Sequence, residues 1–315
     1  MTDYGDGQIL LATDFSKPAQ RAHAYAAKLA TAFNARLVIL NVLEGTPVLD
    51  REFPVNALYL KQLQEEADRE LTKLARLVKR DGISVEPWLE YGIPAQCIAK
   101  AAEKRSAALI VLGTHGRTGW NRVLLGSTAE AVVREASCPV LTVRLAEESA
   151  GLPGDATIES LLVPIDFSEF AQEALEYAAL LAKQLNARVR LVHAMTAAAY
   201  PLDFALFNVR EEKALQEKVH ERLEELVSAV KADGVVAEGV CEVGAPGEVI
   251  LKHAKEEGAG AIVMGTHGRR GLSHLALGSV AEYVVRHAAC PVFTVKSPRY
   301  RYNRTREVSD AKQKA

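Results

Sequence analysis

Short apolar runs alternate with amphipathic stretches along the whole chain. Runs such as Gln8–Thr13 and Ala107–Leu112 are almost continuously apolar, which is typical of strands buried on both faces. Between such runs, apolar residues recur at the 3.6-residue spacing of a helix face, as in Ser127–Glu135. This alternation predicts a parallel α/β sheet covered by helices.

The chain repeats itself at a constant offset of 152 residues. Asp14-Phe-Ser16 recurs as Asp166-Phe-Ser168, and Gly113-Thr-His-Gly-Arg117 recurs letter for letter as Gly265-Thr-His-Gly-Arg269. The period is the size of a domain, which indicates a tandem duplication and not a solenoid. We therefore expect a first domain at 1–146, a linker at 147–157, a second domain at 158–297 and a basic tail at 298–315.

The first copy is expected to hold five strands and four helices, with residues 45–57 as a loop. The expected strands are Gln8–Thr13, Arg36–Leu43, Ile83–Glu90, Ala107–Leu112 and Val140–Arg144. The expected helices are one capped by Ser16, then Leu58–Lys79, Pro94–Arg105 and Ser127–Glu135. The second copy follows the same order, so the fold class expected is α/β, with two tandem copies of a doubly wound five-stranded parallel sheet and helices on both faces.

Composition excludes several protein classes. The chain has 315 residues, of which 49% are hydrophobic and 25% charged, and a net charge of -2. These values exclude a largely disordered chain, and no global basic field draws the chain to nucleic acid or to an anionic membrane. The apolar runs are too short to span a bilayer, and no basic region precedes an apolar run at the start. We expect a cytoplasmic protein.

The four cysteines fit that expectation. Cys97, Cys138, Cys241 and Cys290 form no C-x-x-C pair and have no histidine at zinc-finger spacing. They are expected to be buried small hydrophobes in a reducing compartment, not a disulfide framework or a metal site.

The candidate chemistry lies where two strands end. Asp14 follows the first strand, and Gly113-Thr-His-Gly116, nine residues and Gly126-Ser127 follow the fourth. Ligands of open α/β sheets bind at such strand ends. The first glycines allow close backbone approach and positive φ, and a helix that starts at Gly-Ser favours an anion. Basic residues in the loops are candidate phosphate partners: Arg117, Arg122, Arg269 and Arg270.

This pattern resembles the ATP-binding signature of universal stress proteins, G-x-x-G, nine residues, G-[S/T]. The first-strand aspartate and the closing Cys-Pro-Val strand are also similar, and the resemblance covers about 6–146 and 158–297. It implies a tandem universal stress protein of the ATP-binding type, with the Rossmann-like fold of adenine nucleotide alpha hydrolases. In that family the closing strands pair across a dimer twofold. Here Val140–Arg144 and Val292–Lys296 are expected to be edges that pair within one chain, and a further homodimer stays open.

The resemblance also implies a role for each matching residue. Asp14 and Asp166 would contact the ribose or an ATP-bound Mg²⁺, and the backbones of Val42 and Ala194 would hold adenine. Ala194 departs from the family's valine and would pack the base less well. The remaining residues implied in the two nucleotide sites are Gly113, His115, Gly116, Arg117, Gly126, Ser127 and Thr128 in the first copy, and Gly265, His267, Gly268, Arg269, Gly278, Ser279 and Val280 in the second.

Other conspicuous residues are expected to be structural. His115 and His267 suit loop bracing as well as phosphate contact. The histidines without a partner pattern, the two tryptophans and the acidic residues after the glycine loop are expected to pack or to face solvent. These are His23, His193, His253, Trp88, Trp120, Glu130 and Glu282. The basic tail is expected to be a solvated terminus, with nucleic acid as the less favoured partner.

Three functions compete. The first is a regulatory ATP-binding protein that passes its nucleotide state to a protein partner, which stays unidentified. The second is a slow Mg-dependent ATP hydrolase or phosphotransferase, and the third is a structural stress protein that binds no nucleotide. The sequence favours the first because it lacks a Walker motif, a G-x-G-x-x-G turn, a Ser-Gly-Gly pyrophosphatase loop and a nucleophile with its base. No catalytic residue is assigned.

Overall fold

The structure is a computed structural model. It describes residues 7–44, 54–79, 82–114, 125–144, 157–196, 209–268 and 277–296.

Each copy contains five strands in the expected order. The first copy consists of β1 (Gln8–Ala12), α1 (Lys17–Ala32), β2 (Arg36–Leu43), α2 (Pro54–Lys79), β3 (Val85–Tyr91), α3 (Pro94–Lys104), β4 (Ala107–Gly113), α4 (Ser127–Glu135) and β5 (Val140–Val143). The second consists of β6 (Ser160–Pro164), α5 (Glu169–Leu185), β7 (Arg188–Met195), α7 (Val209–Ala232), β8 (Ala237–Val243), α8 (Pro246–Glu256), β9 (Ala261–Gly265), α9 (Ser279–His287) and β10 (Val292–Val295). The expected fold class is confirmed.

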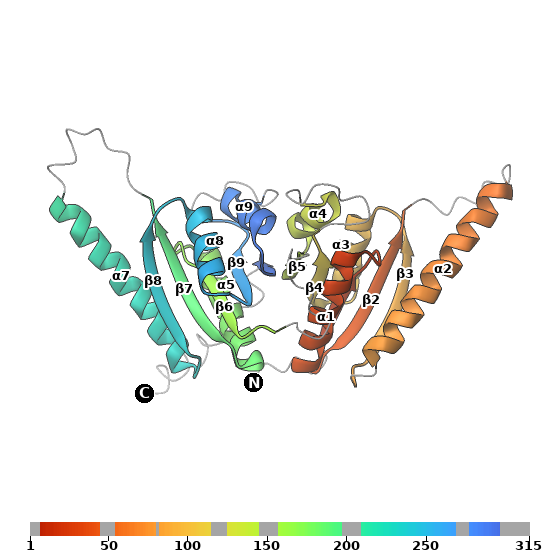
Figure 1. The fold of residues 1–315 in the computed structure, drawn as a ribbon, viewed down its shortest axis with the longest axis horizontal. Coiled ribbons are helices and arrows are strands. Elements are labelled where there is room, and N and C mark those ends of the chain that lie inside the picture. Colours follow the sequence, from red (N-terminus) through yellow and green to blue (C-terminus); the bar gives the residue numbers. More distant parts are fainter. Residues whose placement is uncertain are drawn as a thin grey trace, which may run out of the picture.

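The ten strands form one sheet in the order β3-β2-β1-β4-β5-β10-β9-β6-β7-β8. Strands within a copy are parallel, and β5 and β10 pair antiparallel, with Leu141 opposite Phe293. Figure 1 shows the copies side by side, with α2 and α7 at the outer ends, and the paired strands β5 and β10 join them. The outer edges of the sheet are therefore β3 and β8, and the closing strands lie at its centre. In β3, Pro87 occupies an edge strand, where a missing N–H is tolerated.

Alternating strand residues bury the two faces of the sheet. Ile9 and Leu11 pack with α1, α2, α5 and α7 in one cluster. Leu10 and Ala12 pack with α3, α4, α8 and α9 in the other. Both clusters run through both copies, because the sheet is continuous at β5 and β10. The hydrophobic core thus joins the copies into one packed unit.

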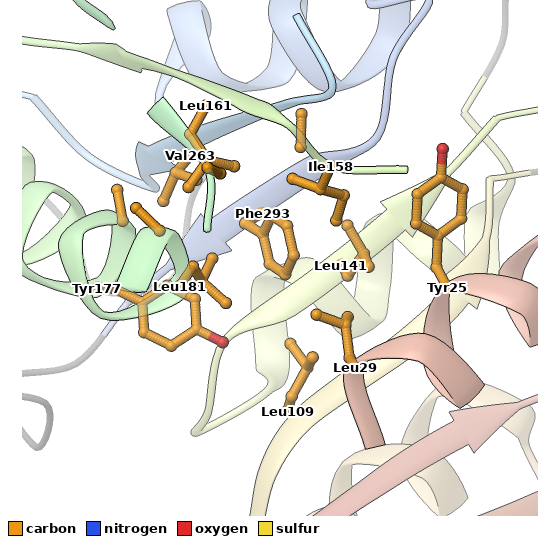
Figure 2. Close-up of a cluster of buried hydrophobic side chains, with 14 of the residues drawn as sticks. Tyr25, Leu29, Leu109, Leu141, Ile158, Leu161, Tyr177, Leu181, Val263 and Phe293 are labelled. Atoms are coloured by element: carbon orange, nitrogen blue, oxygen red, sulfur yellow. The ribbon is translucent and has the colours of Figure 1, made fainter. Parts of the chain in front are cut away.

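The core at this joint centres on Phe293, which is fully buried (Figure 2). Its ring meets Tyr177 edge-on, with the ring centroids 6.1 Å apart. Thr142 Oγ1 donates to the carbonyl of Val292 at 3.2 Å, and Thr294 Oγ1 donates to that of Val140 at 3.3 Å. Apolar packing and polar contacts therefore both cross from one copy to the other.

Two expectations need correction. Helix α2 starts at Pro54, inside the segment expected to be a loop, because proline is favoured in the first turn of a helix. Among the four free cysteines Cys138 is buried, whereas the other three are partly exposed. In the segments that the structure describes, no helix combines the length and apolarity needed to cross a bilayer.

Candidate functional site

The candidate site lies at the carboxyl ends of β1 and β4, where the chain turns toward opposite faces of the sheet. These two strands are neighbours, and Ala12 lies opposite Leu112 at their carboxyl ends. The chain leaves β1 toward α1 on one face and leaves β4 toward α4 on the other. A crevice is expected at this switch point, and Asp14 and Thr114 stand on its two sides, each two residues beyond the paired positions.

The turn after β1 is strained. Phe15 adopts φ 62°, the left-handed region that a bulky residue rarely enters. Asp14 Oδ1 accepts the Ser16 N–H at 3.0 Å, and Ser16 Oγ caps α1 by accepting the Ala19 N–H at 3.4 Å. Backbone strain of this kind concentrates at functional sites.

The second copy reproduces this turn. Phe167 also has φ 62°, and Asp166 Oδ1 accepts both the N–H of Ser168 at 3.0 Å and its hydroxyl at 2.5 Å. The Phe167 ring lies 4.7 Å from the ring of His193 and 5.0 Å from the Arg222 guanidinium carbon. The aspartate of each copy is therefore held by the turn that follows it.

The glycines of the second copy allow the backbone to approach closely. A Cβ atom on Gly268 would lie 2.8 Å from Asp166 Oδ2, so the carboxylate that follows β6 reaches the loop after β9. A Cβ on Gly265 would lie 2.9 Å from the carbonyl oxygen of Phe170 in α5. Neither glycine has a positive φ, so in the second copy the close approach and not the backbone conformation favours glycine. The packing of α5 leaves no room for a side chain at Gly265, and the contact with Asp166 leaves none at Gly268.

Helices α4 and α9 begin without a side-chain cap. Their N-cap residues are Gly126 and Gly278, and in the described part of the chain neither helix start has a side-chain cap hydrogen bond. In contrast, serines cap α1 and α5. The cap glycines themselves donate to the carbonyls of Thr114 and Thr266 at 2.8 Å, which ties each helix start to its strand. Uncapped first-turn N–H groups and the helix dipole favour an anion.

The comparison with known families finds the same family in both copies. The model of the universal stress protein family matches residues 7–144 and again residues 157–296. This chain belongs to the universal stress protein family.

Curated relatives carry the same family name. A universal stress protein of Mycobacterium bovis is 30% identical over 250 residues, which cover 78% of this chain and 76% of the relative. Another, from Mycolicibacterium smegmatis, is 28% identical over 304 residues, covering 94% and 98%. The crystal structure of a universal stress protein from Archaeoglobus fulgidus aligns with a TM-score of 0.69 at 24% identity, over 94% of this chain and 99% of that chain, and so shares its fold.

The remaining site residues of this universal stress protein fall into three groups. Val42 and Ala194 lie near the ends of β2 and β7, half-buried against the second core cluster. Ser127 and Ser279 open their helices and are exposed, with Thr128 and Val280 behind them. Gly113 ends β4. The residues outside the described part of the chain are His115, Gly116, Arg117, Arg122, Trp120, Arg269 and Arg270.

The histidines near the strand ends brace them. His23 Nε2 lies 2.9 Å from Thr13 Oγ1, and burial lowers the pKa of His23 to about 4, against the attraction of Asp14. His193 Nδ1 contacts the Ile165 carbonyl at 2.6 Å. His267 Nδ1 lies 3.0 Å from Thr266 Oγ1. The structure thus gives His23 and His193 the structural roles expected of them.

Sequence reasoning missed two features of the site. It did not find the left-handed phenylalanines, because only glycine, asparagine and aspartate signal that conformation. It also did not find that Glu130 and Glu282, whose side chains are partly exposed as expected of a solvated face, both contact Arg286. Within the described segments, no group of three or more His, Cys, Asp or Glu side chains is arranged to hold a metal ion.

Proposed function

We propose that each copy binds ATP at the switch point of its sheet and that the protein acts as a nucleotide-dependent regulator. The observation that carries this proposal is the meeting of two features in the second copy. The Asp166 carboxylate lies against Gly268, and α9 starts nearby with an uncapped first turn. A carboxylate suits a ribose or a magnesium ion, and a bare helix start suits phosphate.

The phosphates are assigned to the helix starts. In the first copy the first-turn N–H groups of Ser127 and Thr128 would bind them, and in the second those of Ser279 and Val280. The serine side chains are exposed and add a hydroxyl donor. When bound, Mg²⁺ would neutralise part of the phosphate charge, and Asp14 or Asp166 would hold it.

The adenine is assigned to the ends of β2 and β7. Val42 and Ala194 would hold the base through backbone contacts. The side chain of Ala194 is smaller than that of Val42 and offers the base less apolar area. We therefore expect the second site to bind more weakly than the first.

The test is calorimetric titration of the full chain with Mg-ATP. We expect two bound nucleotides per chain, and one in each of the variants Gly126→Val and Gly278→Val. Ser279→Ala should weaken the second site by about tenfold or more, because a hydrogen bond to a charged group is lost. The matched control is Ser160→Ala, at the opposite end of the β6 strand from the site.

Three outcomes would contradict the proposal. A flat titration on folded protein rules out nucleotide binding and favours a structural stress protein. Wild-type stoichiometry in both glycine variants rules out the phosphate assignment. Steady phosphate release that Asp14→Asn abolishes would replace the regulator with the ATP hydrolase.

A further inference from the structure

Arg144 and Arg286 link the copies at their joint, and Arg21 supports Arg144 within the first copy. Arg21, in α1, donates from Nη1 to the carbonyl of Arg144 at 2.8 Å. Arg144, directly after β5, donates from Nη1 to the carbonyl of Arg286 at 2.7 Å. Arg286 is the penultimate residue of α9. A cation of the first copy therefore binds the carboxyl end of a helix in the second, where the helix dipole favours it.

The Arg286 side chain in turn stands between two carboxylates. Its Nη2 lies 2.8 Å from Glu282 Oε1 and 3.9 Å from Glu130 Oε2. Glu130 is the fourth residue of α4, and Glu282 is the fourth residue of α9. Each carboxylate thus belongs to the first turn of a helix whose start is assigned to phosphate. The Arg286 guanidinium therefore contacts one carboxylate from each of the two helices.

The duplication makes this arrangement asymmetric. The residue that matches Arg286 in the first copy is Arg134, and it pairs instead with its neighbour Glu135 at 3.2 Å. Arg134 is part of α4, as Arg286 is part of α9. Arg134 is therefore a matched control, because it has the same charge at the same helical position but no shared contact among the described residues.

We propose that the two nucleotide sites are coupled negatively through Arg286. A polyphosphate at the start of α4 adds negative charge near Glu130 and attracts Arg286 toward the first copy. Glu282 then loses part of its neutralising partner, and the start of α9 becomes less favourable for a second polyphosphate. The inference rests on the proposed function, since it concerns the regulation of the same two sites.

The size of the coupling follows from the charges involved. In a half-exposed setting, moving one unit charge by a few ångströms changes the affinity of a neighbouring anion site by about threefold to fivefold. By linkage, each nucleotide weakens the other by the same factor. Because Arg286 and both glutamates are partly exposed, the coupling should shrink in high salt.

The experiment is calorimetric titration of the full chain with Mg-ATP. Gly278→Val and Gly126→Val give the affinity of each site while the other is empty. In the wild type, the second binding step should be about threefold to fivefold weaker than the affinity of that site alone. The coupling ratio is the affinity of a site while the other is empty divided by its affinity in the second binding step. Arg286→Gln should bring this coupling ratio to one, whereas Arg286→Lys should keep the wild-type ratio because the cation is kept. Arg134→Gln should also leave the ratio at the wild-type value.

Each outcome decides between the two proposals. If the wild type binds no nucleotide, the proposed function fails. If it binds two nucleotides independently, the proposed function stands and the coupling is refuted. If Arg286→Gln and Arg134→Gln change the ratio equally, the shared arginine is refuted as the link. The inference is supported if the coupling ratio falls to one in Arg286→Gln but keeps its wild-type value in Arg286→Lys and in Arg134→Gln.

Discussion

The two copies keep the same backbone around the candidate site but differ in the polar residues beneath it. In the first copy Asn41 Nδ2 donates to the Thr13 carbonyl at 2.7 Å, and Thr13 also contacts His23. In the second, His193 replaces Asn41, and the positions of Thr13 and His23 hold Ile165 and Leu175. The strained phenylalanine and the glycine helix start are common to both.

A second difference lies at the outer end of the second copy. There His253 lies between Glu242, 2.8 Å from Nε2, and Glu257, 3.1 Å from Nδ1. The matching positions of the first copy hold Ala101, Glu90 and Arg105. The backbone that shapes the site has thus been kept, while the supporting contacts have diverged. Substitutions at these positions therefore test whether the contacts act separately in each copy.

The largest expected effect is at the joint, where Phe293 matches Leu141 of the first copy. Phe293→Ala should lower the free energy of unfolding by about 3–5 kcal/mol, because it removes a fully buried ring from the core shared by both copies. Denaturant unfolding followed by circular dichroism measures the loss. Tyr59→Ala, at an exposed position on α2, is the control and should cost far less. Equal losses would show that the joint contributes little.

Most of the fold could be predicted from the sequence because its signals are local. The bounds of β2 and α4 agree with the expectation, since continuous apolar runs and helical spacing depend only on neighbouring residues. Gly82 and Gly234 both have φ 80° after long helices, where glycine signals such a turn.

The features that escaped prediction depend on contacts between distant segments. Phe15 is held at φ 62° by the packing of its ring in the core and by Thr13 Oγ1, which accepts its N–H at 3.0 Å. The contact between Arg286 and Glu130 exists because β5 and β10 bring α4 beside α9. No spacing in the sequence encodes such a contact. The candidate site was proposed from local signals, the glycine motif and the aspartate after the first strand, and its nucleotide assignment stays a prediction.

The next effect is a loss of stability in acid, and it arises from His23, which has no histidine counterpart in the second copy. Burial lowers the pKa of His23 from 6.5 to about 4, so the unfolded chain takes up a proton below pH 6.5 while the folded chain resists until about pH 4. Stability should therefore fall by about 3 kcal/mol across this window and should not change above it on account of His23. His23→Leu, the residue of the second copy, should remove this loss.

Urea unfolding at pH 7, 6, 5 and 4 measures this difference between wild type and variant. His220→Leu, at an exposed position on α7, is the control and should keep the wild-type slope. An unchanged slope in His23→Leu would mean that His23 is accessible to protons in the folded protein.

The smallest effect concerns His253, which is buried in the second copy between two carboxylates. Hydrogen bonds from Lys252 and His253 lower the pKa of Glu242, and Arg190 also pairs with Glu257. The network therefore keeps cations when His253 is removed, and His253→Ala should lower the melting temperature by only about 2–4 °C. His253→Gln, which can still donate, should recover part of the loss. Lys61→Ala, which breaks the exposed pair with Glu65, is the control. If His253→Ala lowers the melting temperature no more than Lys61→Ala does, the buried network adds nothing to the stability of the second copy.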